Sequence, residues 1–505
     1  MERVPIKSQN LSKIAIRGST YNLLSSAILK FGGLAFTIIV ARMLLPELFG
    51  VYALALSIVT IALTFTDLGM GATATRYISD ALGRERQKKA RSYTRYFLKI
   101  KSFLILIAVI LLIMISKYLS YTVYKNPLIY YPLLFSCLLI LSEAFREFFS
   151  LFFVVEKNLK PITILDLILQ ISKISFSVLA LLIFINDFKV IGLFIAFFLS
   201  SLMTLLISLL ILFKKNKFLF FGKTQKINKR KIKSYWKYMA LATLSLAFFG
   251  SIDTLMLGGF VSSEYLGYYR ASLSLILAVT SILSVSGILL PIFTQIHKKR
   301  FIRGFHKTIR LLLIIAIPST VGIVFLARYL IFLVYGTDYL PATSSVYFLS
   351  LLVFTTPLIA LYSMILESKE KPKIVSNAVI ISLVTNVILN YIAIKTLISD
   401  PILVIGGVGA ATALSRVILL GILVYYSRKD LGFQVGGLGL RKPILSTLAL
   451  GGFLFVFNLI FDINIFTGIL EVVLGSGIYF GALILMKGIG KEDWKLLKGL
   501  IKNKD

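Results

Sequence analysis

The chain has 505 residues, of which 58% are hydrophobic and only 15% are charged, whereas a soluble protein of this size carries roughly 25% charged residues. Apolar runs of about 20 residues, the length that a helix needs to cross a bilayer, recur from end to end, and the ten-residue alternation of membrane barrels does not occur. The composition therefore predicts an all-α polytopic membrane protein and excludes a soluble enzyme.

The formal net charge of +33 would indicate nucleic-acid binding in a soluble protein. Here the basic residues are gathered in particular connecting loops, so we expect no nucleic-acid partner. Cys137 is the only cysteine, and both histidines, His297 and His306, fall in one basic loop. We therefore expect no disulfide, metal site or cofactor. Residues 1–18 are polar and basic, and we expect no cleavable signal there.

Hydrophobic runs predict about fourteen membrane helices. They lie at residues 20–44, 49–70, 96–116, 127–155, 161–185, 190–213, 238–261, 265–293, 311–335, 342–366, 374–394, 403–427, 443–461 and 466–486. The connecting segments alternate: those on one side carry 41 lysines and arginines, and those on the other side carry 4. By the positive-inside rule, both termini lie in the cytoplasm of a multi-pass plasma-membrane protein.

The hairpin formed by the first two predicted helices recurs later in the chain. Four of its residues match residues 217 positions further on: Glu47, Gly50, Tyr52 and Ser57 correspond to Glu264, Gly267, Tyr269 and Ser274. An E-x-x-x-K-P pattern at 156–161 also matches 367–372, at an offset of 211. Each copy contains six helices, an even number, so both copies have the same orientation in the membrane.

The repeat predicts three parts. Residues 1–233 form an N-terminal lobe of six helices with a basic cytoplasmic linker. Residues 234–427 form a C-terminal lobe of six helices. Residues 428–505 contain two further helices and a basic tail.

Two sequences in the first hairpin, ARMLLPELFGVYALA and TDLGMGATATRYISDALGR, carry a family resemblance. With Asn386, Asn390 and the Gly-Ala run at 406–413, they resemble Wzx-type polysaccharide and O-antigen flippases of the multidrug/oligosaccharidyl-lipid/polysaccharide (MOP) exporter superfamily. The resemblance covers residues 17–427. It implies two lobes around a central cavity that opens alternately to either side. The implied cargo is an oligosaccharide linked to a polyprenyl phosphate or pyrophosphate, moved from the inner to the outer leaflet.

Four basic residues near the middle of predicted helices are candidates for contact with such an anionic headgroup: Lys30, Arg146, Lys173 and Arg416. A charge at a helix centre costs at least about 2.5–3.5 kcal/mol, so these side chains should face the bundle interior. Fixed cations in a wet groove would offset the energy of moving a negative headgroup across the bilayer. The alternative is a salt bridge within the bundle; for Arg146, Glu143 and Glu147 lie on the same helix face.

Deep carboxylates are candidates for coupling to H⁺ or Na⁺. Asp253 has no obvious neighbour on its own helix, and Glu143 is a second candidate. The alternative for Asp253 is a cation across the bundle, such as Lys30. In the fifth predicted helix, a continuous polar stripe is expected to face the groove or the lobe interior. It consists of Asp166, Gln170, Lys173 and Ser177.

The opening motif supplies candidates for a gate or for a structural role: Arg42, Glu47, Gly50, Asp67 and Arg76. Asp67 closes the second helix, so we expect it to contact backbone N–H groups or Arg76. Arg42 and Lys101 lie nearer to helix ends, and the simplest interpretation is that they snorkel to the interface.

The sequence favours a flippase for polyprenyl-linked oligosaccharides that works by alternating access. Its expected partners are that lipid, the surrounding membrane lipids and a coupling ion. A cation-coupled multidrug antiporter is the alternative, but four deep cations against three acids favour anionic cargo. A membrane oligosaccharide polymerase is a further alternative, disfavoured by the short outer loops. No Walker motif occurs, so we expect no nucleotide partner and no enzyme activity.

Overall fold

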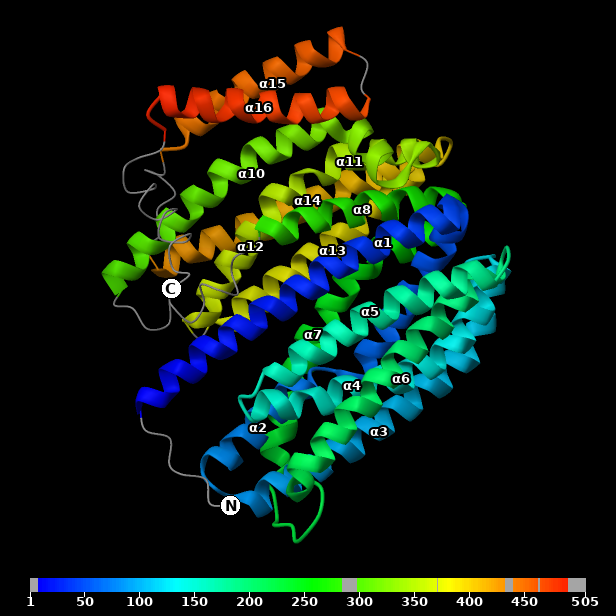
Figure 1. The fold of residues 1–505 in the computed structure, drawn as a ribbon, viewed down its shortest axis with the longest axis vertical. Helices are drawn as coiled ribbons and strands as arrows, with labels where there is room; N and C mark the ends of the chain where they lie inside the picture. Colours follow the sequence, from blue (N-terminus) through cyan, green and yellow to red (C-terminus); the bar gives the residue numbers. More distant parts are fainter. Residues whose placement is uncertain (1–7, 284–297, 370, 432–438, 462–463, 489–505) are drawn as a thin grey trace. The chain divides into compact units, whose positions relative to one another are not determined.

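The computed structural model describes residues 8–283, 298–369, 371–431, 439–461 and 464–488. Within these ranges every regular element is a helix (Figure 1). The chain divides into two compact units, Met1–Arg270 and Ala271–Asp505. The lobe boundaries at residues 233 and 427 stay predictions.

The first unit begins with the predicted hairpin. α1 (Ser8–Asp67) contains two helical arms, because Leu45 has a left-handed φ of 61° and Pro46 has no N–H to donate. This break confirms the turn between the first two predicted helices, 20–44 and 49–70. The unit continues with α2 (Met70–Gly83), α3 (Gln87–Tyr118), α4 (Tyr130–Val155), α5 (Lys160–Ile183), α6 (Phe188–Asn216), α7 (Lys229–Gly258) and the start of α8 (Ser263–Leu283). The short turns η1 (Leu119–Val123), η2 (Pro127–Ile129) and η3 (Lys217–Leu219) lie between them.

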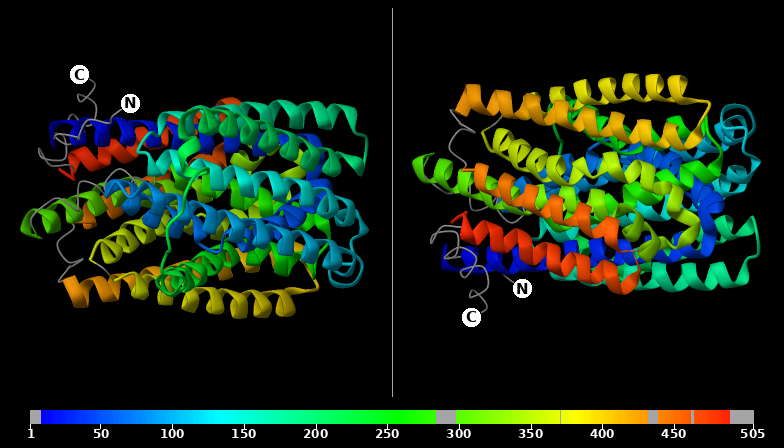
Figure 2. Two further views of the ribbon diagram at one scale, coloured as in Figure 1. Left: turned by 90° about the horizontal axis from the view of Figure 1, so that it is seen from below. Right: turned by 90° about the horizontal axis from the view of Figure 1, so that it is seen from above.

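Helix α6 packs against both α4 and α5 in the first unit, and the second view shows these helices running nearly parallel (Figures 1 and 2). Phenylalanine rings of α4 and α3 fill the core beside α2, among them Phe97, Phe148 and Phe152. α1 contacts α5 on one side and α7 on the other, and α7 also contacts α2. These contacts explain why α7 belongs to the first unit.

The second unit is organised around α14 (Pro401–Leu431), which contacts α11, α12 and α13. Besides the rest of α8, its elements are α10 (Lys298–Tyr335), η4 (Thr337–Ala342), α11 (Thr343–Leu349), α12 (Leu351–Ser368), α13 (Pro372–Leu397), α14, α15 (Arg441–Ile460) and α16 (Ile465–Leu485). The helix predicted at 342–366 is thus divided between η4, α11 and α12. α15 and α16 lie side by side and contact α10 (Figure 1). The end of the helix predicted at 265–293, His297 and most of the basic tail lie outside the described residues.

Thirteen helices among the described residues are long and apolar enough to cross a membrane. The first of these spans, Leu24–Gly83, contains both arms of α1 and therefore two predicted crossings. The observed spans thus correspond to the fourteen predicted helices. The prediction of an all-α polytopic membrane fold is confirmed.

Candidate functional site

Arg146 and Glu143, on the same face of α4, form a two-pronged ion pair inside the first unit. Arg146 Nε donates to Glu143 Oε2 over 2.7 Å, and its Nη2 donates to Oε1 over 2.5 Å. The hydroxyl of Ser201 on α6 also donates to Glu143, over 2.7 Å. The side chains are only 14% and 18% exposed. The salt bridge that the sequence left open for Arg146 is therefore present.

Lys173 on α5 is held between two aromatic rings. Its Nζ lies 4.2 Å from the centroid of the Phe36 ring on α1 and 4.6 Å from that of Phe197 on α6. Its charge also interacts with that of Glu143. A desolvated cation–π contact is worth about 2 kcal/mol. Lys173 thus has aromatic rings as its nearest neighbours inside the bundle, and it lacks the close two-pronged partner that Arg146 has.

The polar stripe of α5 faces the first arm of α1. Ser25 donates a hydrogen bond to Asp166, and Gln170 Nε2 donates to the carbonyl of Leu29 over 3.4 Å. Asp166, Gln170 and Ser177 are buried. The expectation that this stripe faces the interior is confirmed. Lys30, on the same arm of α1, is exposed.

Lys101 on α3 is fully buried. Its Nζ is 3.8 Å from Asp67 Oδ1 and donates to Thr66 Oγ1 over 3.3 Å. The interpretation that Lys101 snorkels is wrong, because Asp67 and Thr66 supply partners where it lies. Asp67 also accepts the backbone N–H of Gly71 over 3.0 Å, as expected. Its cationic partner is Lys101, whereas Arg76 stacks on Tyr235.

Glu147 on α4, the residue after Arg146, has an exposed carboxylate. It lies nine residues after Leu138, an exposed apolar residue of α4, and at about 100° per residue this places the two on opposite sides of the helix. Its charge interacts with those of Glu143, Arg146 and Lys101. A carboxylate in the membrane span is not stable against lipid, so we expect this side of α4 to face water. The spacing showed that Glu147 shares a face with Arg146, but only the structure shows its exposure.

These side chains form one charge network in the first unit, from α1, α3, α4 and α5. It contains four carboxylates and three cations: Asp67, Glu143, Glu147, Asp166, Lys101, Arg146 and Lys173. The network thus has one more carboxylate than cations, whereas the sequence suggested four deep cations against three acids. Among the described residues, no three His, Cys, Asp or Glu side chains are placed to hold a metal ion.

The remaining candidates lie elsewhere. Asp253 on α7 is buried, and its Oδ2 accepts the hydroxyl of Tyr269 over 2.9 Å. Arg42 and Glu47 are exposed beside the α1 break, and Gly50 is buried there. Arg416 is half-buried on α14 of the second unit.

Comparison with known proteins agrees with this picture. A family model described as polysaccharide biosynthesis protein matches residues 15–297. The probable low-salt glycan biosynthesis flippase Agl15 of Haloferax volcanii is 25% identical over 268 residues, which are 51% of this chain and 53% of that protein. The match thus spans about half the length of that relative.

Solved structures share the fold. The lipid II flippase MurJ, in an inward closed conformation, superposes with a TM-score of 0.69 at 17% identity, covering 94% of this chain and 99% of MurJ. An inward-facing multidrug resistance MATE transporter superposes with a TM-score of 0.58 at 14% identity, covering 82% of this chain and 94% of the transporter. A MOP superfamily transporter from Pyrococcus furiosus is described as having a binding pocket of reverse polarity. It superposes with a TM-score of 0.56 at 15% identity, covering 83% of this chain and 96% of that transporter. The family model confirms the resemblance to polysaccharide-export proteins, and the solved structures show that the fold is shared with MOP superfamily transporters.

Proposed function

We propose that this chain, which belongs to the family of polysaccharide biosynthesis proteins, is a flippase for a lipid-linked glycan. In this proposal it moves an oligosaccharide on polyprenyl phosphate or pyrophosphate from the inner to the outer leaflet by alternating access. It makes and breaks no covalent bond in its cargo. The description of Agl15 as a glycan biosynthesis flippase supports the proposal.

The charge network of the first unit is the observation that carries the proposal. Four of its groups lie near the middle of α4 or α5: Glu143, Arg146, Glu147 and Lys173. Each charge at a helix centre costs about 2.5–3.5 kcal/mol, so these four are more than a purely structural bundle requires. Glu147, exposed on the side of α4 opposite Leu138, supports a water-filled space beside the network. A charged headgroup needs such a space to cross the low-dielectric barrier.

We assign the network's cations different roles. Arg146 is neutralised by Glu143 and serves as a structural brace. Lys173 rests on aromatic rings and retains charge for an anionic headgroup. Lys30, exposed on α1, and Arg416, on α14, remain candidates for the same role.

The carboxylates support coupling to a cation. Glu143 is occupied by Arg146 and Ser201, and Asp253 accepts the hydroxyl of Tyr269. Glu147 makes no ion pair within 4 Å among the described residues and is exposed. We therefore add Glu147 to Asp253 and Glu143 as a candidate site for H⁺ or Na⁺.

The test is transbilayer movement of a fluorescent polyprenyl pyrophosphate oligosaccharide in proteoliposomes. We expect the wild-type protein to move it and Lys173→Gln to slow movement at least about tenfold, because a charge-assisted contact with the headgroup is lost. Lys160→Gln is the matched control, since Lys160 begins the same helix and is exposed; its rate should change less than about twofold. No movement by the wild-type protein would refute the flippase.

A cation-coupled multidrug antiporter is the second candidate, favoured by the fourth carboxylate of the network. The same vesicles discriminate between the two. Uptake of an organic cation driven by an H⁺ or Na⁺ gradient, abolished in Glu147→Gln, together with no lipid movement, would favour the antiporter.

A further inference from the structure

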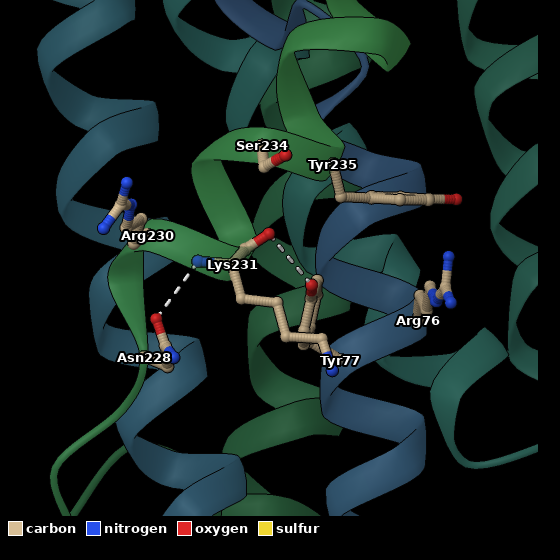
Figure 3. A pocket seen from close by; sticks show the side chains of 7 residues that line it. All are labelled: Arg76, Tyr77, Asn228, Arg230, Lys231, Ser234 and Tyr235. Atoms are coloured by element: carbon tan, nitrogen blue, oxygen red, sulfur yellow. Dashed lines mark hydrogen bonds between the residues drawn. The ribbon is translucent and has the colours of Figure 1, made fainter.

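A basic cavity of about 510 Å³, wide open to the surface, lies between α2 and the first turns of α7, in the first unit. Arg76 and Tyr77 of α2 line one wall; Arg230, Lys231 and Tyr235 line the α7 side (Figure 3). Its volume is within the range of about 300–1,000 Å³ that is typical of small-ligand sites. The positive-inside rule assigns this face of the protein to the cytoplasm.

The walls of the cavity are held in place by contacts between the two helices. The Arg76 guanidinium lies 4.4 Å from the centroid of the Tyr235 ring, and the Tyr77 ring meets Tyr235 edge-on at 6.3 Å. The Tyr77 hydroxyl donates to the carbonyl of Lys231 over 3.3 Å. Figure 3 shows Arg76 and the Lys231 side chain on the same side, next to both tyrosine rings, and Arg230 on the other side of the α7 turn.

The lining contains three cations and no carboxylate. The nearest acidic residue along α2, Asp80, lies four residues after Arg76 and forms its ion pair with Arg84 over 2.9 Å. The N-terminal turn of α7 adds positive potential, since a helix carries about half a positive charge at that end. Asn228, which caps the helix by accepting the Lys231 N–H over 3.1 Å, fixes that turn at the cavity.

Charges that only set membrane orientation need no particular arrangement beyond their side of the bilayer. Here arginine, lysine and two tyrosines converge on a cavity that their own contacts preorganise. A planar guanidinium with an adjacent ammonium suits phosphate oxygens.

We propose that this pocket binds the phosphate or pyrophosphate group of the lipid-linked substrate on the cytoplasmic side, before transport begins. The choice of ligand rests on the proposed flippase function. Arg76 and Lys231 hold the phosphate oxygens, Arg230 adds to the local positive field, and the rings of Tyr77 and Tyr235 face the sugar adjoining the phosphate.

The test is equilibrium binding of a fluorescent polyprenyl pyrophosphate to the full-length protein in phosphatidylcholine nanodiscs. We expect Arg76→Gln/Lys231→Gln to weaken binding at least about tenfold, because two charge-assisted contacts are lost. The matched control is Lys88→Gln/Lys229→Gln, which removes the same charge from exposed positions outside the lining and should change affinity less than about twofold. Thermal unfolding of each variant checks that it is folded.

Competition separates the sources of phosphate. Inorganic pyrophosphate and phosphatidylglycerol should each displace the probe at least about tenfold less effectively than unlabelled polyprenyl pyrophosphate. Equal competition by phosphatidylglycerol would reduce the pocket to attraction for any anionic membrane, and equal competition by inorganic pyrophosphate would make it a site for soluble anions. An equal loss of binding in the control variant would also overturn the proposal.

The pocket and the transport function can fail separately. Lipid movement by the wild-type protein, with binding unaffected by Arg76→Gln/Lys231→Gln, would overturn the pocket and leave the flippase standing. Specific binding that those substitutions abolish, in a protein that moves no lipid, would support the pocket and overturn the flippase.

Discussion

The two copies of the repeat place different chemistry around equivalent tyrosines. Tyr269 donates its hydroxyl to the buried carboxylate of Asp253. Tyr52, its counterpart 217 positions earlier, packs instead against Phe194 and Phe197. The position equivalent to Asp253 is Phe36, whose ring supports Lys173. Both copies therefore have the tyrosine, but where the second copy has the carboxylate of Asp253, the first has the Phe36 ring, which contacts the ammonium of Lys173.

This divergence predicts unequal effects of the same substitution. Tyr269→Phe should destabilise the protein by about 1–3 kcal/mol, because the buried Asp253 loses a hydrogen-bond donor. Tyr52→Phe should have a smaller effect, since no hydrogen bond of its hydroxyl is found among the described residues. The thermal unfolding midpoints of the two variants in detergent would measure the difference, and equal midpoints would contradict it.

The Arg146–Glu143 pair predicts non-additive substitutions. Removing one partner strands a charge in the membrane span and should cost about 3–5 kcal/mol, whereas removing both leaves no stranded charge. We therefore expect Arg146→Leu and Glu143→Gln each to unfold at a lower temperature than the double variant. A double variant that unfolds below both single variants would show that the pair itself is the main source of stability.

At the scale of helices, the repeated glycines form one close contact. A Cβ on Gly50 would overlap the carbonyl oxygen of Ser263, and a Cβ on Gly267 would overlap that of Pro46. Ser263 and Pro46 are themselves 217 positions apart, so the contact is reciprocal. The motif that revealed the repeat is therefore the point where α1 and α8 approach each other with backbone against backbone.

This crossing predicts that Gly50→Ala and Gly267→Ala both destabilise the protein, by at least about 1–3 kcal/mol, because the helices must separate to admit a methyl group. Gly250→Ala on α7 is the matched control, since nothing lies within 4 Å of its added Cβ. There the loss of a helical glycine should stabilise by about 0.5–1 kcal/mol. Differential scanning fluorimetry in detergent would compare them, and intact midpoints for the Gly50 and Gly267 variants would rule out the tight crossing.

The asparagine and Gly-Ala patterns that carried part of the family resemblance also act between helices. Asn386 Nδ2 of α13 donates to Thr412 Oγ1 of α14 over 3.5 Å, and Ser382 of α13 donates to the carbonyl of Ser415 on α14 over 2.7 Å. Gly409 lies against the backbone of α11 at Ser345. In lipid, small residues and buried polar side chains join helices that have no hydrophobic drive to associate. These motifs therefore describe packing in the second unit.

For the whole molecule, the alternation of basic and nearly uncharged loops predicts that the basic loops and both termini lie in the cytoplasm. In a Cys137→Ser background, a cysteine introduced at Asp400 should react with an impermeant maleimide on intact cells. One introduced at Lys223 should react only after the membrane is opened. Both positions are exposed, so access is set by their side of the membrane. The reverse pattern would place the termini outside.

The sequence by itself determined the helical membrane class, the number of crossings, the turn between the first two predicted helices and the inward face of the α5 stripe. Each follows from segment length or helical period, which are local properties. The partners of the charged residues were decided only by tertiary structure. Spacing placed Glu143 within reach of Arg146, because both lie on one helix. It could not show that Lys101 meets Asp67 across two helices, or that Lys173 rests on rings from α1 and α6. Such contacts depend on how helices pack, and residues far apart in the chain meet only once the helices are packed together.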